Sequence, residues 1–260
     1  MNTSINDTRQ LKNIITNDIQ SSLSIAHSAS LYIQQNEALS VKGFAKIQTV
    51  ISSISSAMRT LIILNDITLK NGDNNYLKMS YCNIDNFFSS MVNELNSIFA
   101  AGTDVSFKYT SKLEKSRTFY INIRETEKIL YSLIYCLVKN PGKQNGKEIK
   151  ITIDETIGKK SSYIITITSK GKPLDKKLSS IFNKETEENI DFYNLDVLSL
   201  LTVRKNIEAL GADITYTTTK TMNKFIFSLP HTTELDQYSE YTPYTPDTDF
   251  IRGYFYDLLI

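Results

Sequence analysis

The sequence lacks an excess of charge of either sign. Its 260 residues include 29 basic and 28 acidic side chains, which gives a formal net charge of +1 at pH 7. This balance gives no reason to expect a nucleic acid or an anionic membrane surface as a partner. The hydrophobic fraction of 41% is ordinary for a globular chain that is long enough to form one or two domains.

Long apolar runs are also missing. No run approaches the ~20 apolar residues that a membrane-spanning helix needs. The first ten residues are polar, whereas a signal peptide would be basic and then apolar. We therefore expect a soluble protein of the cytoplasm.

Cysteine is scarce as well. Cys82 and Cys136 lie far apart, each inside or beside an apolar run. Buried, reduced thiols in a cytosolic protein are the favoured interpretation, and a disulfide between them stays open.

The pattern of residues 8–66 predicts a helical hairpin with a break at residues 35–37. In its second helix, side chains at steps of three and four form a seam typical of coiled coils: Phe44, Ile47, Ile51, Ile54, Met58, Leu61 and Asn65. The first helix carries a weaker stripe. A lone hairpin cannot bury both stripes, so it must pair with a second copy or with another layer of the chain.

After residue 75 the pattern alternates between helices and strands. Helices are predicted at 84–99, 125–139 and 195–210, and strands at 105–109, 119–123, 149–153, 163–168, 214–218 and 224–229. This order favours an α+β fold, a sandwich with helices on one face of a mixed sheet.

The last thirty residues form a separate kind of segment. Residues 234–249 are acidic and rich in tyrosine, and they contain Tyr241-Thr242-Pro243-Tyr244-Thr245-Pro246, which suggests a mobile linker. Apolar residues then return at helical spacing between Phe250 and Leu259. We expect this terminal peptide to dock, either on its own chain or in a groove of a partner.

The order of elements after a helical hairpin resembles the dimerisation and ATPase halves of bacterial sensor histidine kinases. Residues 84–107 resemble the opening helix and strand of that ATPase fold, and residues 123–139 resemble the helix that carries a magnesium-binding asparagine. Residues 167–173 stand where the adenine-binding box belongs, and residues 198–214 resemble the helix and strand that follow the second glycine-rich box. The resemblance implies a histidine-kinase-ATPase-like α/β sandwich. A sheet domain unrelated to kinases is the alternative.

The residues that bind nucleotide in this family are replaced. The degenerate positions are Ser132, Cys136, Ser169 and Gly171. Cys136 takes the place of the asparagine, and a thiol is a poor ligand for a hard cation. Ser169 takes the place of the adenine-binding aspartate, and no glycine occurs between Gly171 and Gly211 to form a phosphate-binding loop. We therefore expect no ATP, no other cofactor and no metal.

The first helix is similar to that of the ChpT-like histidine phosphotransferases, homodimers that combine such a hairpin with an ATPase fold that no longer binds nucleotide. The likeness rests on residues 17–23, Asn17-Asp18-Ile19-Gln20-Ser21-Ser22-Leu23. It implies that Asn17 occupies the phosphoacceptor position and that a receiver domain docks beside it, on Asn17, Asp18, Gln20, Ser21 and Ser24. The amide nitrogen of Asn17 has no free lone pair to attack phosphorus.

His27 is the one histidine within the predicted hairpin, ten residues beyond Asn17 and therefore turned by about 80° around the helix. It is the candidate catalytic residue, and we expect it to face solvent among polar neighbours. A surface histidine without a chemical role is the alternative.

Together these features predict a homodimer with three parts: a dimerisation hairpin at 1–75, a degenerate ATPase-like domain at 76–230 and a tail at 231–260. Two copies of the hairpin would form a four-helix bundle. The favoured function is phosphorelay signalling, in which the protein binds a response-regulator receiver domain without acting as a kinase. A structural adaptor that works through its terminal peptide is the main alternative, followed by a nucleotide-binding enzyme.

Overall fold

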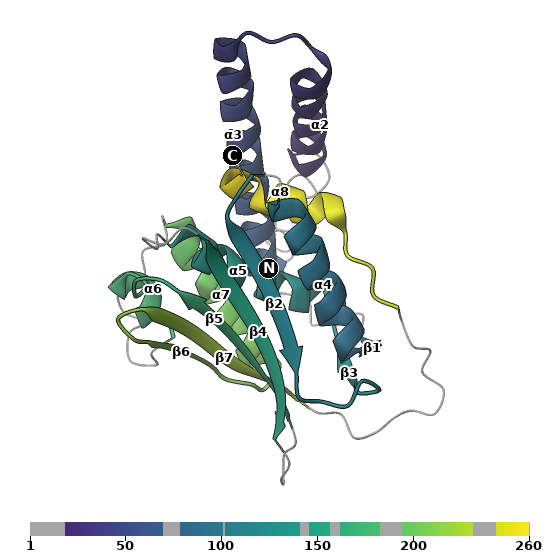
Figure 1. The fold of residues 1–260 in the computed structure, drawn as a ribbon, viewed down its shortest axis with the longest axis vertical. Helices are drawn as coiled ribbons and strands as arrows, with labels where there is room; N and C mark the ends of the chain where they lie inside the picture. The colour runs from purple at the N-terminus through teal and green to yellow at the C-terminus, as the bar shows by residue number, and fades with distance from the viewer. Residues whose placement is uncertain are drawn as a thin grey trace, which may run out of the picture. The chain divides into compact units, whose positions relative to one another are not determined.

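The chain folds into two compact units. The computed structural model describes residues 19–69, 79–100, 102–140, 146–156, 162–182, 194–230 and 243–259. Unit 1 comprises residues 1–75 together with 249–260, and unit 2 comprises residues 76–248 (Figure 1). Within the described ranges, every helix is too short or too polar to serve as a membrane span.

Unit 1 is built on the predicted helical hairpin, formed by α2 (Gln20–Asn36) and α3 (Val41–Leu69). The break falls where the sequence predicts it, because α2 ends at Asn36, whose side chain donates to the carbonyl of Tyr32 at 3.0 Å. The Oγ of Ser40 then accepts from the N–H of Gly43 at 3.1 Å and caps the start of α3. The part of the hairpin that precedes residue 19, including Asn17 and Asp18, lies outside the described residues.

The terminal helix α8 (Thr248–Leu259) belongs to unit 1 from Asp249 onward. It buries Ile251, Tyr254, Phe255 and Tyr256, and the hydroxyl of Tyr256 donates to the side chain of Gln34 on α2 at 3.5 Å. The terminal peptide therefore docks on its own chain. The prediction of a mobile linker is wrong for residues 243–248, because Tyr244 there is only 6% exposed.

Unit 2 is an α+β sandwich on a five-stranded sheet of order β2-β4-β5-β7-β6 (Figure 1). The strands are β2 (Val105–Ser111), β4 (Lys147–Thr156), β5 (Ser162–Lys170), β6 (Ile214–Thr218) and β7 (Met222–Pro230). Only β2 and β4 are paired in parallel; the other neighbours are antiparallel. Alternate residues of β4, β5 and β7 are buried, so one face of the sheet packs on the core.

Three helices cover that face: α4 (Ile84–Phe99), α5 (Ile123–Lys139) and α7 (Leu195–Ala209). Each begins directly after an asparagine whose side-chain oxygen accepts from a first-turn N–H group, namely Asn83, Asn122 and Asn194. In Figure 1, α5 and α7 lie behind the sheet. A short helix, α6 (Lys176–Ser180), follows β5.

A second, two-stranded sheet was not predicted. Strand β1 (Ser80–Asn83) pairs antiparallel with β3 (Thr118–Ile121) and leads straight into α4. Strand β3 matches the strand predicted at 119–123, whereas β1 was missed because its sequence, Ser80-Tyr81-Cys82-Asn83, shows no apolar alternation. Cys82 on β1 is fully buried and Cys136 on α5 is 7% exposed, and both are free thiols.

Candidate functional site

The positions that resemble a nucleotide site gather at the carboxyl ends of α5 and β5. Ser132 and Cys136 lie one turn apart on α5, and both are buried. Ser169, near the end of β5, pairs with Ile149 of β4 and Asn223 of β7 and is also buried. The structure thus places all of them in unit 2, on the elements that the resemblance assigns to the site.

Cys136 is an inert thiol in this setting. Burial and, to a smaller extent, the charge of Asp196 raise its pKa to about 12, against the opposing charges of Lys139 and Lys147. A thiol with such a pKa stays protonated at neutral pH and is neither a nucleophile nor a metal ligand. Among the residues that the structure describes, no group of three or more His, Cys, Asp or Glu side chains could hold a metal ion.

The two lysines beside Cys136 are already engaged by the protein. Lys139 Nζ donates to Asp196 Oδ2 at 2.6 Å, and this ion pair joins the end of α5 to the start of α7. Lys147 Nζ donates to the backbone carbonyl oxygens of Asn140 at 2.5 Å and Val138 at 3.3 Å. Both ammonium groups therefore act as structural bridges rather than as free anion ligands.

Amide side chains tie the end of α5 to the loop after β5. Asn140 Nδ2 and Asn223 Nδ2 both donate to the carbonyl of Lys172, at 2.6 and 2.8 Å. The N–H of Gly171 donates to the carbonyl of Thr221 at 3.0 Å. The loop that would face an adenine in a kinase is thus held in place by protein groups.

His27 is half-buried, whereas the sequence predicted a solvent-facing position. Its ring makes an edge contact with Tyr256 of α8, with 5.4 Å between centroids, and its Nε2 is buried with no hydrogen-bond partner among the residues that the structure describes. Burial lowers the pKa of the imidazole below its ordinary value. The polar neighbours of His27 predicted an exposed position. The contact of α8 with this part of α2 has no local sequence pattern from which it could be predicted.

Of the proposed docking residues, the structure describes the side chains of two, Ser21 and Ser24. Ser21 and Ser24 are exposed on the surface of α2. Asn17, Asp18 and the side chain of Gln20 lie outside the described residues.

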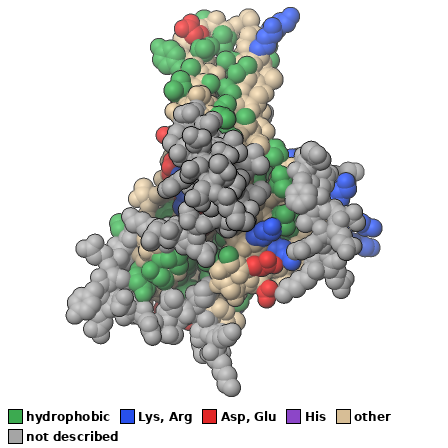
Figure 2. Space-filling model, turned by 180° about the vertical axis from the view of Figure 1, so that it is seen from behind, with side chains coloured by type: hydrophobic (Ala, Val, Ile, Leu, Met, Phe, Trp, Pro, Cys, Tyr) green, Lys and Arg blue, Asp and Glu red, His purple; other side chains and the backbone are tan. Residues whose placement is uncertain are grey.

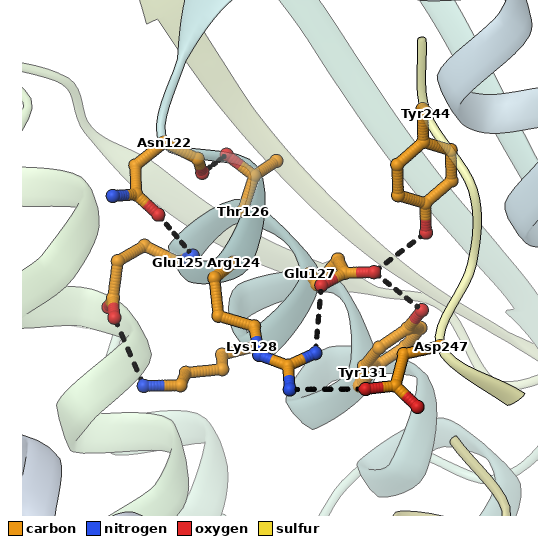
Figure 3. A network of polar contacts seen from close by, with 9 residues as sticks. All are labelled: Asn122, Arg124, Glu125, Thr126, Glu127, Lys128, Tyr131, Tyr244 and Asp247. Carbon is orange, nitrogen blue, oxygen red and sulfur yellow. Dashed lines mark hydrogen bonds and ion pairs between the residues drawn. The ribbon is translucent and has the colours of Figure 1, made fainter. Parts of the chain in front are cut away.

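A further polar network of unit 2, not predicted from the sequence, surrounds Glu127 on α5 (Figure 3). The Glu127 residue is 3% exposed. Its Oε1 accepts from the hydroxyl of Tyr244 at 2.8 Å and from that of Tyr131 at 3.4 Å. Its Oε2 lies 3.4 Å from Nη1 of Arg124, whose Nη2 lies 3.4 Å from Asp247 Oδ2.

Burial dominates the electrostatics of this network. It raises the pKa of Glu127 above its ordinary value, while hydrogen bonds from Tyr244 and the charge of Arg124 oppose that shift. Burial likewise raises the pKa of both tyrosines, so their hydroxyls remain protonated donors. The ring of Tyr244 also packs on Phe87 of α4, with 4.4 Å between centroids.

One half of the signal in the sequence for this network was the repeated Tyr-Thr-Pro in the tail. A carboxylate on the strongly apolar helix 125–139 was the other half of the signal, because such a group is buried only with partners. Nothing in the sequence joins positions that are 117 residues apart.

Comparison with solved structures identifies this fold. Full-length ShkA, solved in complex with AMPPNP, superposes with a TM-score of 0.62 and 12% identity over 92% of this chain and 47% of that chain. The Acinetobacter baumannii histidine kinase AdeS superposes with a TM-score of 0.52 and 15% identity over 81% of this chain and 96% of that chain. The chain has a histidine-kinase-like fold.

That likeness concerns the fold, since the identities are low. This chain spans about half of the ShkA chain that it matches. No protein-family model matches the sequence, and no curated protein matches it. The ATPase-like sandwich expected from the resemblance is confirmed.

Proposed function

We propose that this protein acts in two-component phosphorelay signalling, binds a response-regulator receiver domain and has no kinase activity. The observation that carries the proposal is a histidine-kinase-like fold whose nucleotide positions hold Cys136 and Ser169. With a protonated thiol in place of a magnesium ligand, such a fold keeps its surfaces for partners while lacking the chemistry of a kinase.

The receiver would dock on the first helix beside Asn17, Asp18, Gln20, Ser21 and Ser24. Ser21 and Ser24 are exposed and could meet it directly. Since Asn17 cannot carry phosphate, and the Nε2 of His27 is buried beside Tyr256, we infer a pseudo-phosphotransferase that holds or positions its receiver.

We also propose a homodimer through the hairpin, with residues 1–75 as its dimerisation domain. Figure 2 shows hydrophobic side chains spread over the helices of the hairpin. Among them Ile25 is 69% exposed, Tyr32 64% and Val50 46%, although unit 1 includes α8. Pairing with a second copy in a four-helix bundle would bury this surface.

A structural adaptor is the second candidate, since the terminal helix makes defined contacts. The docking of α8 on α2 favours it, because helix-on-helix contacts of this kind can be exchanged for a partner helix. In that case residues 76–230 would serve only as a degenerate ATPase-like scaffold.

A receiver-binding assay tests the favoured function. Purified protein would be titrated with a panel of receiver domains from the source organism, and we expect binding by at least one. Asn17→Arg and Ser21→Arg place a long cation on the docking surface and are expected to weaken that binding at least tenfold. Ser106→Arg, at an exposed position of β2, is the matched control and should bind normally.

Phosphoryl transfer is tested separately, by incubation with phosphorylated receiver and measurement of acid-labile phosphate on the protein. We expect none on the wild type. A label that disappears in His27→Ala would instead make His27 the phosphoacceptor, and the protein a working phosphotransferase. Binding that the arginine variants leave unchanged would favour the adaptor.

A further inference from the structure

Residues 243–247, near the end of unit 2, are held against α4 and α5 by a few side-chain contacts. Tyr244 is buried against Phe87, and Asp247 forms an ion pair with Arg124. Thr245, between them, is exposed. One anchoring ring, one hydrogen bond to a buried acceptor and one charge pair are the contacts by which short peptides are recognised.

We propose that Phe87, Arg124, Glu127 and Tyr131 form a binding site for a peptide that carries a tyrosine and, three residues later, a carboxylate. We call it the tyrosine site. Phe87 packs on the aromatic ring. Glu127 accepts a hydrogen bond from the tyrosine hydroxyl, and Arg124 pairs with the carboxylate (Figure 3). Residues 243–247 are its resident ligand, and a partner with the same chemistry would compete with them.

The buried carboxyl group of Glu127 distinguishes the tyrosine site from an apolar region of the protein core. Without Tyr244, its Oε1 would keep only the hydroxyl of Tyr131, at a long 3.4 Å. A buried carboxyl group with an unfilled acceptor is strongly destabilising, whereas an apolar side chain in its place would pack without any partner. The site therefore demands a hydroxyl group, and it discriminates against a phenylalanine in place of the tyrosine.

Arg124 adds direction to this recognition. Its guanidinium lies between the carboxylates of Glu127 and Asp247, at 3.4 Å from each. The side chains of Arg124 and Asp247 are 47% and 49% exposed, so their pair contributes little affinity. It fixes which way the peptide runs, because only one direction brings the carboxylate to Arg124.

The resident segment also controls access to the site. A tethered ligand acts at an effective concentration on the order of millimolar. An external peptide of equal intrinsic affinity therefore binds weakly until residues 243–247 are released. These residues continue directly into α8, so a partner at the tyrosine site takes the place of the segment that precedes that helix.

The test uses a fluorescently labelled peptide of residues 243–249 and the full-length chain. The resident segment is disabled by Tyr244→Ala and Asp247→Ala, with Tyr241→Phe added because Tyr241-Thr242-Pro243 repeats the bound sequence. We expect the triple variant to bind the peptide at least tenfold more tightly than wild type, as measured by fluorescence anisotropy. Thr245→Ala is the matched control and should behave as wild type.

Two changes test the chemistry of recognition in the triple variant. A peptide with phenylalanine in place of its tyrosine should bind about tenfold more weakly, the equivalent of one hydrogen bond to a buried acceptor. Adding Glu127→Ala should weaken binding of the normal peptide by a similar factor. Equal binding by both peptides, or by both proteins, would overturn the proposal.

Folding of the triple variant is checked by circular dichroism. A folded variant that does not bind the peptide refutes the tyrosine site. If the triple variant does not fold, Asp247→Ala alone serves instead, since it keeps Tyr244 and loosens the resident segment. We then expect binding of the peptide about threefold tighter than by wild type, and no gain would equally refute the site.

Discussion

The first two turns of α5 and its last two turns differ in what their polar residues do. Near the start, Glu127 has partners on α5 itself and accepts a hydrogen bond from Tyr244 at 2.8 Å. Near the end, Cys136 is a buried, protonated thiol. Both regions share the same apolar face, with Ile129, Leu130 and Leu133 fully or almost fully buried.

This contrast separates what the fold requires from what the chemistry requires. The apolar face of α5 is enough to pack the helix on the sheet, so the fold persists when polar residues beside it change. The buried polar residues, by contrast, need hydrogen-bond partners. One end of α5 carries the unreactive thiol of Cys136, and the other end holds a segment of the chain's own tail through Glu127.

The largest effect on stability is expected when Glu127 loses its closest hydrogen-bond partner, Tyr244. Tyr244→Ala removes a buried ring and leaves Oε1 of Glu127 without its 2.8 Å donor, so we expect a loss of about 3 kcal/mol in the free energy of unfolding. Urea denaturation measures it. Thr245→Ala, exposed in the same segment, is the control, and a loss of under about 0.5 kcal/mol for Tyr244→Ala would mean that the segment is not docked.

A pH-dependent effect of intermediate size is expected at the same site. Because the folded-state pKa of Glu127 is raised, folding favours its protonated form, and the stability that it contributes is complete below the unfolded-state value of 4.5. That contribution is lost as pH rises through the higher folded-state pKa. Glu127→Gln lacks this loss, so its stability relative to wild type should increase from pH 4 to pH 7.

Urea denaturation of wild type and Glu127→Gln at a series of pH values gives the comparison. Two parallel curves would contradict the raised pKa. A relative stability of the variant that falls as pH rises would show instead that the carboxylate is stabilised by Arg124 more than it is penalised by burial.

A smaller effect concerns the thiols. Burial raises the pKa of Cys82 to about 11 and that of Cys136 to about 12. At pH 8 only about one Cys136 thiol in ten thousand is ionised, so we expect no rapid labelling by a thiol reagent in the folded protein and two labelled cysteines in urea. Rapid native labelling that Cys136→Ser abolishes would mean that the end of α5 is open to solvent.

The sequence was sufficient for the parts of the fold that depend on periodic patterns. Helices such as 84–99 and the long strands of the main sheet are confirmed, because their apolar residues recur at a constant spacing. Strand β1 was missed, since Ser80-Tyr81-Cys82-Asn83 shows no apolar alternation.

The candidate site was less accessible to sequence reasoning. His27 contacts Tyr256 and Glu127 contacts Tyr244, and both contacts join positions far apart in the chain. Such contacts arise from tertiary packing and leave no local periodicity. Cys136 and Ser169 could be proposed as equivalents of nucleotide ligands because they lie at fixed places within elements whose prediction is confirmed.

Calorimetric titration with ATP and magnesium tests most directly whether this kinase-like fold retains a nucleotide site. ShkA, which was solved with AMPPNP, provides a positive control of the same fold. We expect no saturable heat for this protein up to about 1 mM nucleotide. Saturable binding with a Kd below about 100 μM, weakened by a bulky substitution such as Ser169→Phe, would contradict the account.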